Sequence, residues 1–418
     1  MAKTRISELA AIISTKTEII EQYLRSHNLA SPSFDVDYVD PQLPPDIAVC
    51  KVTISEATEE LNSLLAGPSA FWTTLDTTFL PTIHAIYRFK LASSFPIGGE
   101  ASFAFIASAV DIPEPDVQRI IRLAITHRIF REPRRGIVTH TAISKAIATI
   151  PLLQSFLGLV TEEIWPASTR IVDAIEKWPN SEEPNETGYN LATNQYETYF
   201  NGMKKDPDRG KRFADVMNFT HAGGKFERAG LIAHYDWACM SEGLVVELGG
   251  SQGMMCFDLA RYSPKMKCIS QDLPDVVAGV EVPEDLKGRV EVVAHDFFTE
   301  QPVKNADAYL FRWIFHDWSD KYSIRILRKL IPALKHGARI VTGKVCLPEP
   351  GSISYSIERR MRATDMVMKA CLNGRERDVD QWAQLFTKSD SRFNFKGVIR
   401  IPGSRWSVIE VIWEDVSV

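Results

Sequence analysis

The C-terminal half of the chain alternates short apolar runs with longer stretches of helical spacing. The apolar runs lie at residues 244–248, 267–270, 290–294, 308–314, 338–342, 398–401 and 407–412. Short apolar runs separated by helical patterns are typical of strands in a sheet that is buried on both faces. We therefore predict an α/β fold with a doubly wound, mostly parallel sheet.

The N-terminal part has a different, helical pattern. Apolar residues recur at near-helical spacing from Ile6 to Tyr23, which predicts an amphipathic helix, and a second helical pattern covers residues 54–65. Residues 26–46 contain four prolines and predict a loop. The apolar stripes of these helices can pack in a core or form a dimer interface.

Residues 92–147 resemble a winged helix, with two short helices at 101–110 and 114–126 followed by a two-stranded wing. Such modules often bind DNA, and this segment is rich in arginine. The first helix is apolar, however, and a structural or pocket-lining role is favoured. The polar segment 178–190 is the best linker candidate. We accordingly divide the chain into a helical and winged-helix-like domain at 1–180 and a second domain at 181–418.

Composition changes this picture little. The 418 residues include 48 Lys plus Arg and 53 Asp plus Glu, for a net charge of -5, which gives no attraction to nucleic acid or an anionic membrane. The six cysteines are scattered and favour a reducing compartment, without metal-ligand spacing. We expect a cytoplasmic enzyme that acts on a small molecule, without nucleic acid, membrane or metal partners.

The strongest chemical motif is a glycine-rich turn after the strand 244–248. The strand contains Glu247, the turn contains Gly249 and Gly250, and a helix should open near Met254. Glycines let a ligand approach the backbone, and a helix N-terminus offers free N–H groups. The turn therefore predicts a ligand at the carboxyl end of this strand.

The next two strands end in acidic residues. Asp272 follows the second strand and can accept two hydrogen bonds from a ribose diol, while Asp296 and Phe297 follow the third and suit an adenine. NAD remains possible, but Gly249 and Gly250 are adjacent, so the pattern is not G-x-G-x-x-G. The spacing better suits S-adenosylmethionine, which has no pyrophosphate.

His316 follows the fourth strand and is flanked by Arg312, Asp317 and Trp318. A lone histidine at a strand end is more often structural. This one should face the same cleft as the glycine turn, where an imidazole can serve as a general base.

Together these motifs carry a resemblance. The runs L-F-R-W-I-F-H-D-W-S-D, V-E-L-G-G-S-Q-G, D-L-P and N-G-R-E-R resemble the small-molecule O-methyltransferases of plants and fungi. The resemblance implies a Rossmann-like domain that binds S-adenosylmethionine, N-terminal helices that form a homodimer, and His316 as the catalytic base, steered by Glu376. It also implies a cofactor site made of Glu247, Gly249, Gly250, Asp272, Leu273, Asp296, Phe297, Arg312 and Trp318.

One position departs from the family pattern. A second acid that steers the histidine is expected four residues before the proline of the C-L-P turn, and Lys344 stands there. A carboxylate would favour the protonated ring, whereas an ammonium repels it by about 1 to 4 kcal/mol at about 4 Å. Lys344 should keep the imidazole neutral and add a strong hydrogen-bond donor to the pocket.

Two interpretations follow. In one, Lys344 points to solvent or pairs with Glu376, and methyl transfer continues with one acid. In the other, which we favour, the protein resembles the fungal pericyclase subgroup of the family, the leporin-type and pyridone-alkaloid enzymes. Lys344, with His316 or His295, would then donate to a substrate carbonyl during dehydration and Alder-ene or hetero-Diels–Alder cyclisation. His140, in the wing, is a weaker candidate for substrate contact.

Overall fold

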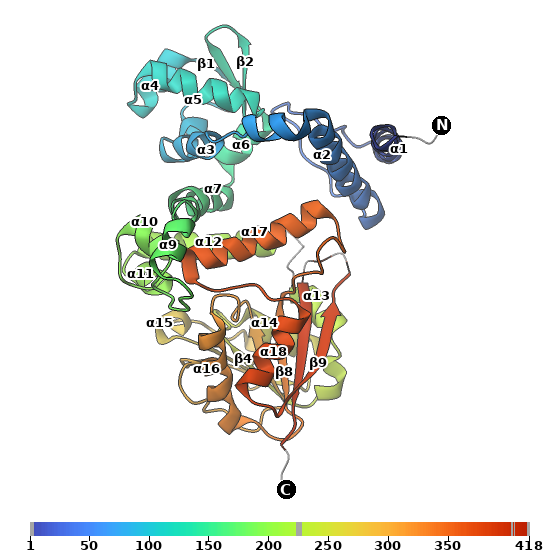
Figure 1. Cartoon of the computed structure of the whole chain (residues 1–418), viewed down its shortest axis with the longest axis vertical. Coiled ribbons are helices and arrows are strands. Elements are labelled where there is room, and N and C mark those ends of the chain that lie inside the picture. The colour runs from blue at the N-terminus through green and yellow to red at the C-terminus, as the bar shows by residue number, and fades with distance from the viewer. Residues whose placement is uncertain (1–3, 223–227, 403, 405, 416–418) are drawn as a thin grey trace. The chain divides into compact units, whose positions relative to one another are not determined.

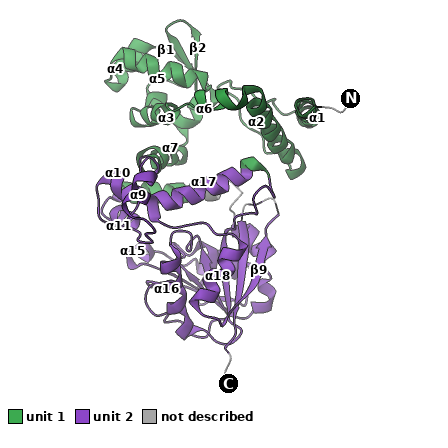
Figure 2. Cartoon of the chain, viewed as in Figure 1, with its two compact units in different colours: residues 1–165, 208–219, 354–356 green, residues 166–207, 220–353, 357–418 purple. Residues whose placement is uncertain are grey.

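The structure, a computed structural model, describes residues 4–222, 228–402, 404 and 406–415. It divides into two compact units (Figure 2). Unit 1 comprises residues 1–165, 208–219 and 354–356, and unit 2 comprises 166–207, 220–353 and 357–418. The segment 178–190, predicted as a linker, therefore belongs to unit 2.

Unit 1 begins with two long helices, α1 (Arg5–Ser26) and α2 (Pro45–Thr73). The first confirms the predicted amphipathic helix, and Thr4 caps its N-terminus by accepting a hydrogen bond from the Ser7 N–H. The second is longer than predicted. It is kinked at Gly67, which has a φ of 71° and directly precedes Pro68. The two helices share a small core that includes Leu24 and Ile47.

The rest of unit 1 surrounds a three-stranded sheet of order β1-β3-β2. Both predicted helices of this region are present, although the first begins two residues later than expected. The elements are α3 (Phe79–Arg88), β1 (Glu100–Ser102), α4 (Phe103–Val110), α5 (Glu114–Thr126), β2 (Phe130–Arg134), β3 (Ile137–His140), α6 (Ala142–Thr149), α7 (Pro151–Leu159) and a π-helical turn at Val160–Ile164.

Several arginines of this region form ion pairs. Arg122 lies 2.9 Å from Glu132, and Arg131 lies 3.0 Å from Asp35. Arg134 also pairs with Glu100. These contacts neutralise much of the charge that had suggested DNA binding.

Unit 2 is built on a seven-stranded sheet of order β6-β5-β4-β7-β8-β10-β9 (Figure 1). The first five strands in this order are parallel, and β10 pairs antiparallel with both β8 and β9. The parallel core confirms the predicted doubly wound sheet. The strands are β4 (Leu244–Leu248), β5 (Lys267–Asp272), β6 (Val290–Ala294), β7 (Ala308–Arg312), β8 (Arg339–Val345), β9 (Phe393–Arg400) and β10 (Trp406–Trp413).

Alternate residues of the central strands enter two separate cores, one on each face of the sheet. Val245 and Leu310 belong to one core, while Val246 and Phe311 belong to the other. Because both faces are covered, these strands are apolar along their whole length, which is the pattern seen in the sequence.

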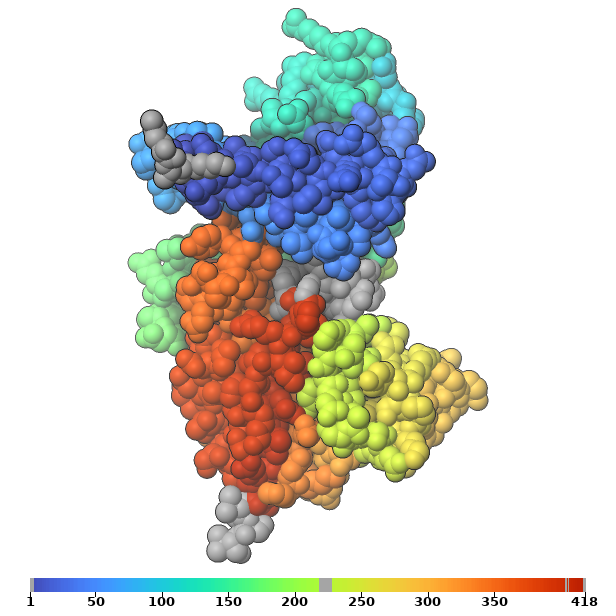
Figure 3. Space-filling model, turned by 90° about the vertical axis from the view of Figure 1, so that its right-hand side faces the viewer, coloured from blue at the N-terminus to red at the C-terminus, as the bar shows by residue number. Residues whose placement is uncertain are grey.

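The helices of unit 2 precede the sheet or connect its strands. They are α9 (Ile171–Lys177), α10 (Gly188–Thr193), α11 (Tyr199–Lys204), α13 (Arg228–His234), α14 (Met254–Tyr262), α15 (Pro274–Val277), α16 (Asp320–Leu330) and α18 (Val379–Ser389). Three more, α8 (Trp165–Ser168), α12 (Pro207–Ala222) and α17 (Tyr355–Leu372), contain residues of both units. The segment after α13 lies against the C-terminal strands (Figure 3), where Tyr235 Oη donates to Glu410 Oε1 at 2.6 Å.

Candidate active site

The glycine turn lies at the carboxyl end of β4, the central strand of the parallel core. Gly249 has a φ of 71°, which favours glycine. A Cβ atom on Gly250 would lie 2.1 Å from Ser270 Oγ and 2.7 Å from Glu247 Oε2. Gly250 is therefore required by internal packing as well as by any ligand that approaches the turn.

Asp272 ends β5, beside this turn. Its Oδ2 atom accepts a hydrogen bond from the Ser251 N–H at 2.8 Å, and its Oδ1 atom accepts from the Leu273 N–H at 2.7 Å. Burial raises the pKa of the Asp272 carboxyl, although both N–H groups act against this. The carboxylate is thus fixed next to the glycine turn, as binding of a ribose requires.

Glu247 is fully buried under the turn. Its Oε1 atom lies 3.6 Å from Arg312 Nε and makes no hydrogen bond within the described part of the chain. Burial raises the pKa of Glu247, and Arg312 opposes the rise. A buried carboxylate oxygen without a hydrogen bond is costly, so it favours a ligand that brings a cation or a donor. The ammonium and sulfonium charges of S-adenosylmethionine fit this requirement.

The end of β6 carries the third part of the predicted cofactor site. Asp296 is exposed, and its Oδ1 atom accepts from the Phe298 N–H at 2.9 Å. The Phe297 ring meets Trp318 edge to face, with 6.3 Å between ring centroids. Neighbouring His295 is half-buried, and burial lowers the pKa of its ring. The sheet order places the ends of β4, β5 and β6 side by side, as the sequence predicted.

A second group of side chains gathers where β7 and β8 end. We call it the histidine cluster: Trp313, His316, Asp317, Lys344 and Glu376. Lys344 Nζ lies 2.7 Å from His316 Nδ1 and 2.9 Å from Glu376 Oε1. The Lys344 and Glu376 side chains are both 0% exposed. Lys344 therefore does not point to solvent but pairs with Glu376, which is one of the two arrangements expected if methyl transfer continues with one acid.

The contact between Lys344 and His316 determines which ring nitrogen carries the proton. A lysine ammonium has only donors, so at 2.7 Å the Nδ1 atom of His316 must accept. The neutral ring then has its proton on Nε2, which lies 3.2 Å from Asp317 Oδ1. The opposite assignment, with Nδ1 donating to Glu376 across 3.3 Å, would set two donors against each other at the shorter distance.

The two carboxyl groups of the cluster respond differently to burial. Burial alone would raise the pKa of Glu376, but the Lys344 ammonium in contact with it lowers that pKa to about 2. For Asp317, burial raises the pKa, and the charges of His316 and Lys344 offset only part of the rise. Glu376 is therefore the carboxylate that balances the Lys344 charge.

Trp313 completes the cluster, because its ring faces the ammonium group of Lys344. Lys344 Nζ lies 3.8 Å from the centre of the Trp313 ring, within cation–π distance. Trp313 has a φ of 59°, which is strained for a large side chain, and strain of this kind is common at functional sites. Trp313 and Asp317 were missing from the predicted site residues, although both lie in the quoted run around His316.

His140 lies in unit 1, where both ring nitrogens are engaged. Nδ1 lies 3.0 Å from Ser144 Oγ, Nε2 lies 3.3 Å from the Phe95 carbonyl, and the ring stacks on Phe95. A ligand would have to displace one of these partners. The surroundings of His140 favour a structural role over substrate contact.

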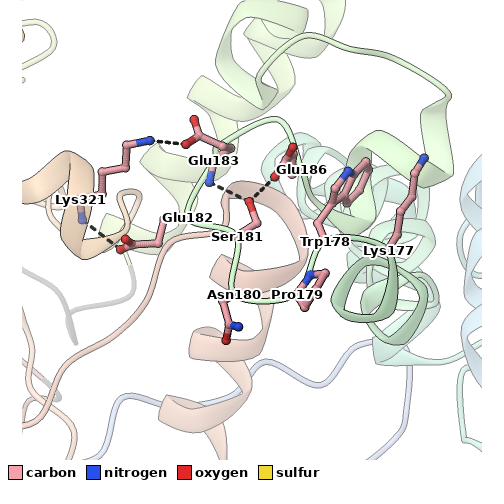
Figure 4. Close-up of a pocket in the computed structure, with 9 residues that line it drawn as sticks. All are labelled: Lys177, Trp178, Pro179, Asn180, Ser181, Glu182, Glu183, Glu186 and Lys321. Atoms are coloured by element: carbon pink, nitrogen blue, oxygen red, sulfur yellow. Dashed lines mark hydrogen bonds and ion pairs between the residues drawn. The ribbon is translucent and has the colours of Figure 1, made fainter.

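A cavity of about 470 Å³ lies along residues 177–186 and Lys321 (Figure 4). None of the predicted site residues lines it. Two of its glutamates bind Lys321: Glu182 accepts from the Lys321 backbone N–H at 3.0 Å, and Glu183 pairs with the Lys321 ammonium. These contacts tie the segment to the start of α16.

Across the described residues, no group of three or more His, Cys, Asp or Glu side chains is arranged to hold a metal ion. In the same part of the chain, no single helix is long and apolar enough to cross a membrane. One bent pair, 142–149 with 151–168, passes that test on length and composition only.

Comparison with known proteins identifies the family. The model of the O-methyltransferase domain matches residues 180–391. The O-methyltransferase kk1A of Curvularia clavata is 38% identical over 423 residues, which is 99% of each chain. The chain belongs to the O-methyltransferase family. It is an enzyme of that family, and the family's cofactor is S-adenosylmethionine.

Two solved structures share the fold of this O-methyltransferase-family enzyme. OxaC in complex with sinefungin and meleagrin matches with a TM-score of 0.74 and 20% identity, covering 97% of this chain and 99% of its own. LepI in complex with S-adenosylmethionine matches with a TM-score of 0.70 and 21% identity, covering 97% and 100%. At these identities the likeness extends to the fold alone.

Proposed function

We propose that this enzyme uses the histidine cluster as a hydrogen-bond donor to a substrate carbonyl. The reaction would be dehydration and pericyclic cyclisation, of the Alder-ene or hetero-Diels–Alder type, of a pyridone made from a polyketide and an amino acid in secondary metabolism. The observation that carries the proposal is the 2.7 Å contact between Lys344 Nζ and His316 Nδ1.

That contact opposes the role of His316 as a base. A base needs a free lone pair on Nε2, and this requires the proton to sit on Nδ1. With Lys344 donating to Nδ1, the proton sits on Nε2, and His316 can donate but not accept. The His316 side chain is 8% exposed, whereas that of Lys344 is 0% exposed, so His316 is the donor that a ligand can reach. Its Nε2–H faces Asp317 Oδ1 at 3.2 Å, and a bound substrate carbonyl would compete with that carboxyl group for the proton.

A donor of this kind suits reactions in which charge develops on a carbonyl oxygen. A preorganised donor in a site shielded from water lowers the barrier because it needs no reorganisation as that charge grows. The positive charge of Lys344 next to Nδ1 polarises the ring and makes the Nε2–H a stronger donor. His295, which directly precedes Asp296 in the chain, is a second candidate donor.

The cofactor edge, defined as Glu247, Gly249, Gly250, Asp272, Asp296 and Phe297, would hold S-adenosylmethionine in this proposal. The bound cofactor supplies a fixed sulfonium charge. Arg312 balances part of the Glu247 charge from the end of β7, and Trp318 packs beside Phe297. In this role the cofactor remains bound and its methyl group is not transferred.

The second candidate function is conventional methyl transfer to a phenolic or polyketide hydroxyl, with His316 as the base. Relatives that are 32% to 38% identical over nearly the whole chain are named O-methyltransferases. The contact of 3.3 Å between His316 Nδ1 and Glu376 Oε1 also favours it, because it could orient the ring for proton removal.

Product analysis separates the two. The purified enzyme with S-adenosylmethionine and an alcohol-bearing 4-hydroxy-2-pyridone should give a product that has lost water, and its cyclised isomers, without S-adenosylhomocysteine. A methylated product with equal S-adenosylhomocysteine, from the pyridone or from a chlorophenol, would contradict the proposal.

A charge-reversal pair strengthens this test. Lys344→Glu should abolish the dehydration because it removes the donor to Nδ1, whereas a methyltransferase should remain active. Lys396→Glu, the same charge change on β9 outside the cluster, is the matched control and should leave the dehydration intact.

We further infer a homodimer that forms through α1 and α2. Large apolar side chains are exposed along the second half of α2 and just after it, which is unusual for a free surface: Leu64, Leu65, Phe71, Trp72 and Leu75. Replacing Leu65 and Trp72 by serine should convert a dimer to a monomer in light scattering. A native protein that is already monomeric would refute the dimer.

The free thiols of all six cysteines agree with a cytoplasmic site of action.

A further inference from the structure

Arg377 is a buried cation just after Glu376, and it lies outside both proposed sites. Its side chain is 1% exposed. It forms an ion pair with Asp320 at 2.7 Å, and Asp320 is itself 29% exposed. Burying a guanidinium costs free energy unless its N–H donors form hydrogen bonds. The other hydrogen-bond partners of Arg377 therefore indicate its structural role.

Two of those partners are backbone carbonyls on either side of the His316–Asp317 pair. Arg377 Nη1 donates to the Phe315 carbonyl at 2.7 Å, and Nη2 donates to the Trp318 carbonyl at 3.1 Å. The planar guanidinium holds both at fixed positions, which a lysine could not do. The backbone of the His316 loop is thus fixed from both ends.

The backbone of the Arg377 segment contacts the other members of the cluster. The Arg377 carbonyl accepts from the Leu347 N–H at 2.9 Å, three residues beyond Lys344. The His316 carbonyl accepts from the Arg375 N–H at 3.0 Å. A Cβ atom on Gly374 would lie 2.1 Å from that same carbonyl, so the two loops are in close contact.

We propose that Arg377 is a positioning residue that fixes Lys344, His316 and Glu376 relative to one another, and so determines which nitrogen of His316 carries the proton. His316 stands on the loop that the Arg377 guanidinium holds, and Glu376 directly precedes Arg377 in the chain. Lys344 stands three residues before Leu347, whose N–H donates to the Arg377 carbonyl. The inference rests on the histidine cluster of the proposed function but not on which reaction the cluster performs.

The test is nitrogen NMR of ¹⁵N-histidine-labelled enzyme saturated with S-adenosylhomocysteine, with the His316 signal assigned from a His316→Gln variant. Arg377→Lys keeps the charge but loses the two fixed carbonyl contacts. It should change the ratio of the two His316 tautomers at least about tenfold, the scale of one charged hydrogen bond. A merely structural role would lower the melting temperature and leave this ratio unchanged.

Arg375→Lys is the matched control, because Arg375 is 43% exposed and reaches Asp320 only at 3.6 Å. It should leave the His316 signal as in the native enzyme. Asp320→Asn loosens Arg377 without replacing it and should shift the ratio in the same direction by a smaller amount. A folded Arg377→Lys enzyme with the native signal would overturn the proposal. If that variant does not fold, a native signal in Asp320→Asn would do so.

The outcome is independent of the reaction. Methyl transfer by the native enzyme would refute the proposed function and leave the Arg377 result standing. A native tautomer ratio in both variants would refute the role of Arg377 and leave the product analysis unaffected.

Discussion

The cofactor edge and the histidine cluster lie at the carboxyl ends of one sheet, but they are built in different ways. At the cofactor edge, backbone N–H groups hold the Asp272 carboxylate, and glycines keep the turn close to the strand. In the histidine cluster, side chains hold one another: a lysine, a histidine and a glutamate lie within 3.3 Å, shielded from solvent.

The difference indicates which part of the site can change without loss of the fold. A backbone-built site depends on the strand–turn–helix itself, so it is preserved whenever that element forms. A side-chain-built site can change its chemistry through one substitution. In the proposed function Lys344 has this effect, because its ammonium would steer the His316 ring to donate a proton, whereas an acid at the same position would steer the ring to accept one.

The largest effect is expected from removing the cation of the histidine cluster. Lys344→Met removes the cation 2.9 Å from the buried Glu376 carboxylate and should lower the free energy of unfolding by about 3 to 5 kcal/mol. Urea unfolding measures this. The double variant Lys344→Met/Glu376→Gln should recover most of the loss. Binding of S-adenosylhomocysteine to the folded single variant should stay native, and a large loss would mean that the two regions are coupled.

Acid should act mainly on the same cluster. The pKa of Glu376 is about 2 in the fold against 4.5 without it. The carboxylate therefore stabilises the fold fully above pH 4.5, by about 3 kcal/mol, and this contribution is lost as the pH falls from 4.5 to 2. The unfolding free energies of the native enzyme and of Glu376→Gln should be measured from pH 7 to pH 3. The difference between the two should shrink as the pH falls below 4.5. A difference that is constant across this pH range would contradict the Lys344–Glu376 pair.

Breaking the cofactor edge should weaken ligand binding and leave the cluster intact. Gly250→Ala forces a Cβ atom to within 2.1 Å of Ser270 Oγ. It should raise the Kd for S-adenosylhomocysteine at least about tenfold, or about 1.4 kcal/mol. Calorimetry measures this, and the His316 NMR signal should stay native. Gly230→Ala is the control, since its Cβ would meet Ile401 at an ordinary 3.5 Å.

The smallest effect is expected at Asp272. Asp272→Asn keeps an acceptor oxygen for one of the two backbone N–H groups and removes the charge that would bind a ribose diol. We expect a Kd for S-adenosylhomocysteine raised about 3- to 10-fold, since a hydrogen bond to a charged group exceeds a neutral one by about 1 kcal/mol. Unchanged binding would remove Asp272 from the cofactor site.

The residues of the cofactor edge could be predicted from the sequence because the motifs that indicate them are local. A strand, a glycine turn and an acid at the next strand end follow one another along the chain, and parallel strands bring their ends together. The sheet and the long N-terminal helix followed from periodicity in the same way. The full length of α2 did not, because Gly67 and Pro68 indicate a break that the structure accommodates as a kink.

The geometry of the histidine cluster could not be predicted in this way. The resemblance set Lys344 beside His316 and offered Glu376 as its partner, but the sequence did not show that Lys344 would contact both at once. Trp313 and Arg377 stand in the runs that carry the family resemblance, but a positive φ angle and hydrogen bonds to distant carbonyls cannot be read from those runs. Long-range side-chain contacts of this kind are set by tertiary packing and not by local spacing.

The protonation of His316 is the most direct test of the donor role. Long-range ¹H–¹⁵N correlation spectra of the histidine-labelled native enzyme at neutral pH distinguish the two ring nitrogens. We expect the proton on Nε2, with Nδ1 accepting from Lys344, and a loss of this preference in Lys344→Met. A proton on Nδ1, hydrogen-bonded to Glu376, would contradict the donor role and assign His316 as the base of a methyltransferase.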